Sequence, residues 1–91
     1  MPLEVTVPAL LEDCTQGQTT FTIEGTTLQE ALDHLLETYP LLRRHLYEET
    51  GRVRPHVLLF YNEASISQLE CLDVPIQPGD RLQIVQAVSG G

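Results

Sequence analysis

One stretch of the sequence, residues 27–39, has the pattern of an amphipathic α-helix. Thr27 and Glu30 are spaced as a capping box, in which both side chains satisfy free backbone N–H groups at the start of a helix. Apolar side chains then recur at steps of three and four and share one face: Leu28, Ala31, Leu32, Leu35, Leu36 and Tyr39. Pro40 follows and ends or kinks the helix, because proline cannot continue the hydrogen-bond ladder. A helix with such a face must pack against another layer, which the rest of the chain has to supply.

Strand patterns precede this helix. Residues 3–7 alternate between apolar and polar side chains, and Pro8 ends or bends that strand. Residues 19–24 are rich in threonine and also alternate, as in a strand with one buried face. A polar turn segment, residues 13–18, separates the two. We therefore predict an antiparallel hairpin at the start of the chain.

The second half of the chain predicts further strands. Residues 56–61 are an almost continuous apolar run, which favours a strand that is buried on both faces or central in the sheet. Residues 65–72 have an ambiguous pattern, for which we expect a short strand with a tight helical turn. Pro78-Gly79-Asp80 fits a type II turn, with glycine at the position of positive φ, and residues 81–88 follow as a final strand.

These elements predict an α+β domain over residues 1–88, with one main helix packed across one face of a mixed sheet. The other face has no helix to cover it. In the final strand Leu82 and Ile84 face the core, so Val85 points to the uncovered side. There it is expected to join an exposed apolar patch of the kind that marks protein interfaces. Its companions in that patch are either Val57 and Leu59 or Leu58 and Phe60.

Size and charge narrow the range of functions. A chain of 91 residues forms one domain, too small to enclose a deep active site of its own. The chain has thirteen acidic residues, five arginines and no lysine, which gives a net charge of -8. An acidic surface repels nucleic acid and suits a basic protein partner. No apolar run approaches the length of a membrane span and the start of the chain lacks a leader pattern, so we expect a cytoplasmic protein.

The sequence holds no pattern of an internal catalytic centre. Cys14 and Cys71 do not stand at metal-ligand spacing with the three histidines, so no metal site is predicted. Ser65 and Ser67 lack a matching His/Asp pattern, and no phosphate-binding glycine loop is present. The function is therefore expected to depend on a partner protein or on a site at the surface of the chain.

The chain finishes on Val88-Ser89-Gly90-Gly91. One interpretation is a frayed end, since chain termini are commonly disordered. The other is that the α-carboxylate of Gly91 is itself the reactive group and is delivered through a narrow channel. Glycine suits such a channel because it has no Cβ.

The order of the predicted elements, the Pro78-Gly79-Asp80 turn and the Val88-Ser89-Gly90-Gly91 ending resemble the ubiquitin-like β-grasp sulfur carriers. These include the small subunit of molybdopterin synthase and the sulfur carrier of thiamine biosynthesis. The stretch Thr6-Val7-Pro8-Ala9-Leu10-Leu11 is most similar to the carriers that serve cysteine synthesis.

The resemblance implies a carrier rather than an enzyme, with catalysis supplied by its partners. An enzyme related to the ubiquitin-activating enzymes uses ATP to adenylate the carboxylate of Gly91. A sulfur donor such as a rhodanese or a cysteine desulfurase then displaces AMP and leaves a thiocarboxylate. A synthase accepts this sulfur for cofactor, amino-acid or tRNA-thiolation biosynthesis. The chain itself is expected to bind no cofactor.

The resemblance also assigns roles to particular residues. Residues 89–91 form a flexible reactive tail, in which Gly91 carries the chemistry. Ser89 and Gly90 thread into the partner enzymes. The residues expected to contact those partners are Val85, Phe60 and Arg81.

Other interpretations stay open. A ubiquitin-like modifier joined through Gly91 to lysines of target proteins uses the same acyl-adenylate, and a small subunit of molybdopterin synthase is a further role. A plain interaction domain does not need its terminal glycines. Arg81 is expected in a surface ion pair or in a contact with the activating enzyme, and Gln86 stands where many relatives have proline. The lack of lysine reflects either an arginine-biased genome or protection of the activated Gly91 from the chain's own amines.

Overall fold

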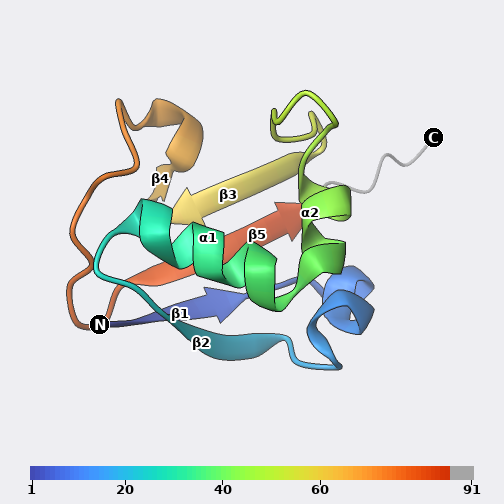
Figure 1. The fold of residues 1–91 in the computed structure, drawn as a ribbon, viewed down its shortest axis with the longest axis horizontal. Helices are drawn as coiled ribbons and strands as arrows, with labels where there is room; N and C mark the ends of the chain where they lie inside the picture. Colours follow the sequence, from blue (N-terminus) through green and yellow to red (C-terminus); the bar gives the residue numbers. More distant parts are fainter. Residues whose placement is uncertain (87–91) are drawn as a thin grey trace.

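Five strands form one mixed sheet in the order β2-β1-β5-β3-β4. The structure is a computed structural model that describes residues 1–86; the predictions for Ser89, Gly90 and Gly91 lie outside these residues. The strands are β1 (Pro2–Thr6), β2 (Thr20–Glu24), β3 (Val57–Tyr61), β4 (Ala64–Ser65) and β5 (Arg81–Gln86). β1 and β5 are parallel, and the other three pairs are antiparallel (Figure 1). The predicted hairpin is thus confirmed, and the predicted final strand is confirmed over residues 81–86.

One long helix, α1 (Leu28–Thr38), lies across one face of the sheet (Figure 1). Its predicted apolar face is confirmed, because Leu28, Ala31, Leu32, Leu35 and Leu36 are all buried. Tyr39 follows the helix and packs edge-on against Phe21 of β2, with ring centroids 5.1 Å apart. The helix and the inward side of the strands together form a single hydrophobic core.

The start of α1 differs in one detail from the predicted capping box. Thr27 is the N-cap, and its side-chain oxygen accepts a hydrogen bond from the N–H of Glu30 at 3.2 Å. The carboxylate of Glu30, however, accepts the N–H of Thr26 at 3.1 Å rather than that of Thr27. The reciprocal hydrogen bond of the capping box therefore forms one residue earlier in the chain. It holds the loop that connects β2 and α1 against the first turn of the helix.

The prediction of one main helix is confirmed, and three shorter helical segments accompany it among residues 1–86. They are α2 (Pro40–Leu46) and the 3₁₀ helices η1 (Ala9–Thr15) and η2 (Ile66–Gln68). η1 takes residues 13–15, the first half of the segment predicted as a polar turn. Its buried Leu11 and Cys14 are three residues apart, which matches the three-residue turn of a 3₁₀ helix. None of the helices described is long and apolar enough to cross a membrane.

The ambiguous stretch and the turn before the last strand are both resolved. Residues 65–72 begin with the end of β4 and continue into η2, so the short strand and the helical turn both occur. Gly79 has a φ of 89°, as the predicted type II turn requires, and the N–H of Asp80 donates to the carbonyl of Gln77 at 3.1 Å. This turn sets the position at which β5 enters the sheet.

Candidate functional site

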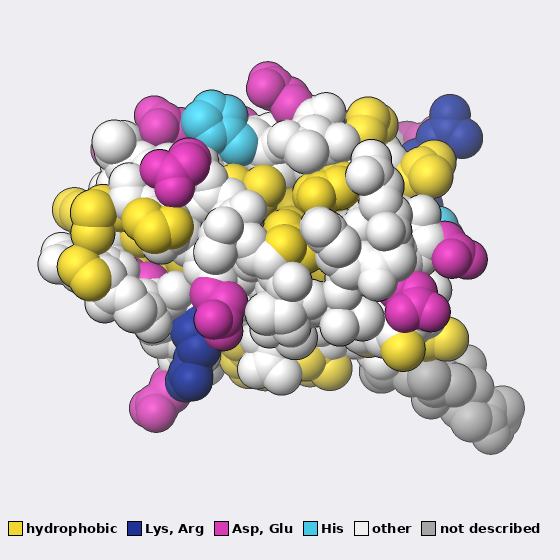
Figure 2. Space-filling model, turned by 90° about the horizontal axis from the view of Figure 1, so that it is seen from below, with side chains coloured by type: hydrophobic (Ala, Val, Ile, Leu, Met, Phe, Trp, Pro, Cys, Tyr) yellow, Lys and Arg dark blue, Asp and Glu magenta, His cyan; other side chains and the backbone are white. Residues whose placement is uncertain are grey.

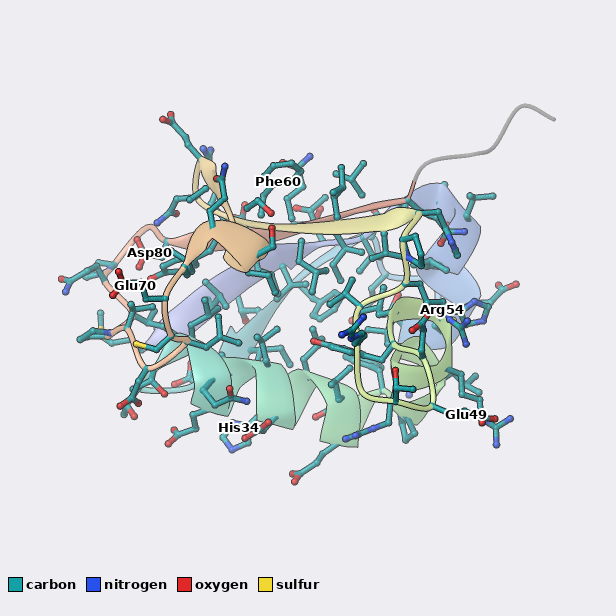
Figure 3. All side chains as sticks on the ribbon, turned by 90° about the horizontal axis from the view of Figure 1, so that it is seen from above. His34, Glu49, Arg54, Phe60, Glu70 and Asp80 are labelled. Carbon is teal, nitrogen blue, oxygen red and sulfur yellow. The ribbon has the colours of Figure 1, made fainter. Side chains whose placement is uncertain are left out.

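The uncovered face of the sheet carries a short apolar strip. Leu58 and Phe60 of β3 point away from the helices, as does Val85 of β5, and Leu58 is the register partner of Val85. Leu58 is 45% exposed, whereas Phe60 and Val85 are half-buried. Figure 3 places Phe60 on the side of the sheet opposite α1. We call these three residues the apolar strip.

The burial of the β3 side chains shows which residues of this strand join Val85 in the apolar strip. Val57 and Leu59 are buried against the core, so the pair on the uncovered face is Leu58 and Phe60. Of the two alternatives predicted for the run 56–61, burial on both faces is wrong, and a position inside the sheet rather than at its edge is confirmed. β3 lies one strand from the edge of the sheet, and the helical layer covers only one side of it.

The rest of this face is polar. In the register of β1 and β5, Glu4 lies opposite Arg81 and Thr6 lies opposite Gln83. All four of these side chains are exposed or half-buried. The apolar strip is therefore confined to the β3 side of the face and to the carboxyl half of β5. That half leads directly into the segment that ends in Gly91.

Arg81 makes no ion pair within the part of the chain that the structure describes. The ion pair found there joins the amino group of Met1 to Glu24 Oε1 at 3.7 Å. Arg81 is exposed at the start of β5, and its backbone N–H and carbonyl bond the side chain and N–H of Asn62. The expected surface ion pair at Arg81 is thus not seen, and the guanidinium stays accessible to a partner.

Gln86 ends the described part of β5 on the inward side, opposite Val57. Its side-chain oxygen is buried and has no hydrogen-bond partner among the described residues. A buried amide without a partner is costly. The side-chain oxygen of Gln86 is therefore poorly satisfied by the described residues.

A polar cluster fixes the other end of β5. The hydroxyl of Tyr61 donates to the carboxylate of Asp80, which also accepts from the N–H of Gln77 at 2.8 Å and from Asn62 Nδ2 at 3.2 Å. Burial, the hydrogen bond to Asp80 and the charge of Asp80 raise the pKa of Tyr61 to about 12. Desolvation by itself would raise the pKa of Asp80, but its three hydrogen bonds outweigh that effect and hold the pKa below its ordinary value.

The described residues bring together neither a metal site nor a nucleophile with its base. No group of three or more His, Cys, Asp and Glu side chains among residues 1–86 is arranged to hold a metal ion. Ser65 and Ser67 line a cavity of about 220 Å³ beside β3, where their hydroxyls bond each other at 2.9 Å. Burial and then the charge of Asp13 raise the pKa of the Cys14 thiol, which disfavours its reactive thiolate.

A larger cavity of about 550 Å³ lies between α1, α2 and the segment that follows α2. Its floor is apolar, and its rim mixes the carboxylates of Asp33 and Glu49 with the guanidinium groups of Arg43 and Arg44. Acidic side chains elsewhere are spread over the face seen in Figure 2 rather than gathered in one patch. The cavity lies on the helical side of the sheet, whereas the apolar strip lies on the uncovered side.

Sequence reasoning singled out Val85, Phe60 and Arg81, and all three lie on the uncovered face. Leu58 was found only as one of two alternatives. The strand register identifies Leu58. Because Val85 points outward, the residue opposite it on the antiparallel neighbour also points outward. The tail residues Ser89, Gly90 and Gly91 lie outside the described residues.

A five-stranded mixed sheet crossed by one main helix, with a bare apolar strip at the carboxyl half of its last strand, defines a ubiquitin-like β-grasp protein. The family comparison agrees with this class, since the ThiS family model matches residues 5–91. The chain belongs to the ThiS family. No curated protein sequence matches it.

Solved structures support the same fold. CysO of Mycobacterium tuberculosis is 25% identical with a TM-score of 0.79, over 94% of this chain and 99% of that one. The match in the BexX/CysO complex of Amycolatopsis orientalis is 24% identical with a TM-score of 0.79, over 98% of this chain and 99% of that one. SAMP1 of Haloferax volcanii is 24% identical with a TM-score of 0.77, and the match spans 100% of both chains. SAMP1 is described as a small archaeal modifier protein.

Proposed function

We propose that the chain is a sulfur carrier whose reactive group is the carboxylate of Gly91. The observation that carries this proposal is the position of the apolar strip, Leu58, Phe60 and Val85, at the carboxyl half of the strand that leads to Val88-Ser89-Gly90-Gly91. A partner that docks on the strip has the end of the chain within reach. Membership of the ThiS family supports the same role.

The chemistry divides between the carrier and its partners. An activating enzyme attaches the Gly91 carboxylate to the α-phosphorus of ATP and releases pyrophosphate, because a free carboxylate is a poor electrophile. The sulfur of a donor then attacks the carbonyl carbon and AMP leaves. Where the donor is the persulfide of a rhodanese or a cysteine desulfurase, a thiol reductant releases the thiocarboxylate from the resulting acyl disulfide. The carrier binds no cofactor itself in this scheme, and ATP is a substrate of the activating partner.

We assign the partner surface to the apolar strip and Arg81, with Ser89 and Gly90 threading toward the activating site. Apolar contacts supply affinity, and the net charge of -8 steers the chain toward a basic partner. CysO of Amycolatopsis orientalis was solved in a complex with BexX, so a relative of this fold binds a second protein. We place the reaction in the cytoplasm, where ATP is available.

Mass spectrometry tests the proposal directly. The chain is coexpressed with an adenylating enzyme and a sulfur donor from the same genome, and its intact mass is measured. We expect a gain equal to the difference between sulfur and oxygen, lost when Gly91 is deleted. Adenylation without any gain in mass, with an active sulfur donor present, would contradict the proposal.

A second candidate role is a protein modifier joined through Gly91 to lysines of other proteins. The likeness to SAMP1, a small archaeal modifier protein, favours testing it. Immunoblots of cell lysate distinguish the roles. A ladder of adducts that disappears when Gly91 is deleted supports the modifier, whereas a single band removes that role. A plain interaction domain instead predicts that deletion of Gly90 and Gly91 leaves function intact.

A further inference from the structure

The chain has one primary amine. None of its five cationic side chains is a lysine, because all are arginines, so the remaining amine is the α-amino group of Met1. Arginine stays protonated in proteins and is a poor nucleophile. Any amide that this chain forms with its own activated Gly91 must therefore use the amine of Met1.

The fold places Met1 at the end of the sheet away from Gln86. β1 and β5 are parallel, and Glu4 is the register partner of Arg81. The carbonyl of Met1 accepts the N–H of Gly25 at 3.2 Å, so the first residue is still paired with the segment that follows β2. Met1 then lies level with a position eight residues before Gln86, which corresponds to about 26 Å along the strands.

Covalent geometry limits how far Gly91 can reach back. Five residues follow Gln86 in the sequence. Fully extended, five residues span at most about 18 Å. The carboxyl of Gly91 therefore falls short of the Met1 amine by several ångströms, whatever path the segment takes.

We propose that the chain is an acyl donor that cannot acylate its own amines: its lysine-free surface and the remote placement of Met1 leave amide formation at the activated Gly91 to amines of other molecules. The inference rests on the proposed function, in which Gly91 is activated. In the reaction that is avoided, an amine nitrogen attacks the Gly91 carbonyl carbon and an amide bond forms. The bond to AMP breaks, AMP leaves with the bonding pair, and the amine proton goes to solvent. The product is a dead-end macrocycle.

A Gly91 α-thioester tests this without any activating enzyme. It is made by cleaving an intein fusion of the full chain with a small thiol, and it exposes the same acyl carbon as the adenylate. Two variants carry the same substitution at different places. His56→Lys adds an amine to an exposed residue next to Val57, the register partner of Gln86. His34→Lys adds one on α1, where Nδ1 of His34 lies 2.6 Å from the carbonyl of Glu24 (Figure 3).

His34→Lys is the matched control because Glu24 pairs with Pro2, at the Met1 end of the sheet. We expect the wild-type and His34→Lys thioesters to disappear by hydrolysis alone. The His56→Lys thioester should disappear about tenfold faster or more, because a tethered amine acts at an effective concentration in the millimolar range. Its product should be lighter by one water than the hydrolysed chain.

Each remaining outcome overturns the inference. A macrocycle from the wild type or from His34→Lys means that Gly91 does reach the far end of the sheet. A His56→Lys thioester that reacts with added cysteine but does not cyclise means that a nearby amine is harmless and the lack of lysine protects nothing. Since the thioester is made without adenylation, neither result depends on whether the chain carries sulfur.

Discussion

The hydroxyl of Tyr61, the last residue of β3, donates a hydrogen bond to the carboxylate of Asp80, the residue before β5. The same carboxylate accepts hydrogen bonds from Gln77 and Asn62. One acidic side chain therefore joins the turn after β3 to the turn before β5. Because β3 and β5 carry the apolar strip, this cluster fixes the register on which the strip depends.

Removal of the hydroxyl by Tyr61→Phe should lower the free energy of unfolding at neutral pH by about 1–2 kcal/mol, because a hydrogen bond to a charged group is lost. Urea denaturation measures this loss. Tyr39→Phe is the control, since its hydroxyl makes a long bond of 3.3 Å to Gln18 at the surface. It should change stability much less, and equal losses in the two variants would contradict the assignment.

The same pair predicts how stability depends on pH. The folded pKa of Asp80 is lowered from its ordinary value of 3.8, so its contribution is present above that value and is lost as the pH falls through the folded pKa. The folded pKa of Tyr61 is raised from 10.0 to about 12, so its contribution is present below pH 10 and is lost as the pH rises toward 12. The free energy of unfolding, measured by denaturation from strongly acidic to strongly alkaline pH, should fall at both ends of the range. Tyr61→Phe should remove the part of the alkaline fall that comes from the titration of Tyr61.

Gly25 is required by the close approach of α1 to the end of β2. A Cβ built on Gly25 would lie 2.8 Å from the backbone N of Ala31, and backbone cannot move aside easily. Gly25→Ala should therefore cost about 1–3 kcal/mol of stability through overpacking. Gly17→Asn is the control, because nothing lies within 4 Å there and asparagine tolerates its positive φ of 83°. A Gly25→Ala protein as stable as the control would mean that the helix shifts without cost.

The buried oxygen of Gln86 offers a substitution that should stabilise the fold. Replacement by leucine removes a polar atom without a partner and keeps a similar volume, so we expect a gain of about 0.5–1.5 kcal/mol. Gln83→Leu on the exposed side of β5 should give no such gain. Thermal and urea denaturation of both variants measure the difference, and a loss of stability in Gln86→Leu would show that the amide finds a partner in solution.

The sequence was most informative where a pattern is local. The helix from Leu28, the turn at Gly79 and the alternation of β5 all follow from periods or motifs within a few residues. The side of β3 that packs on the core could not be read, because a continuous apolar run has no period. The bond between Tyr61 and Asp80 spans 19 residues of sequence and depends on strand register, which only the folded sheet supplies.

The apolar strip yields the prediction that bears most directly on function. Leu58→Asp places a charge at the centre of the strip, and because Leu58 is 45% exposed the fold should tolerate it. If the strip docks the activating enzyme, the Kd measured by calorimetry should rise about tenfold or more, as for the loss of an interface anchor. Thr22→Asp adds the same charge on the exposed side of β2, far from the strip, and should change the Kd little. The affinity of the wild type should also weaken as salt is added, because the net charge of -8 is screened. A Kd that is flat from low to high ionic strength and unchanged by Leu58→Asp would move the partner to another surface, such as the mixed-charge rim between α1 and α2.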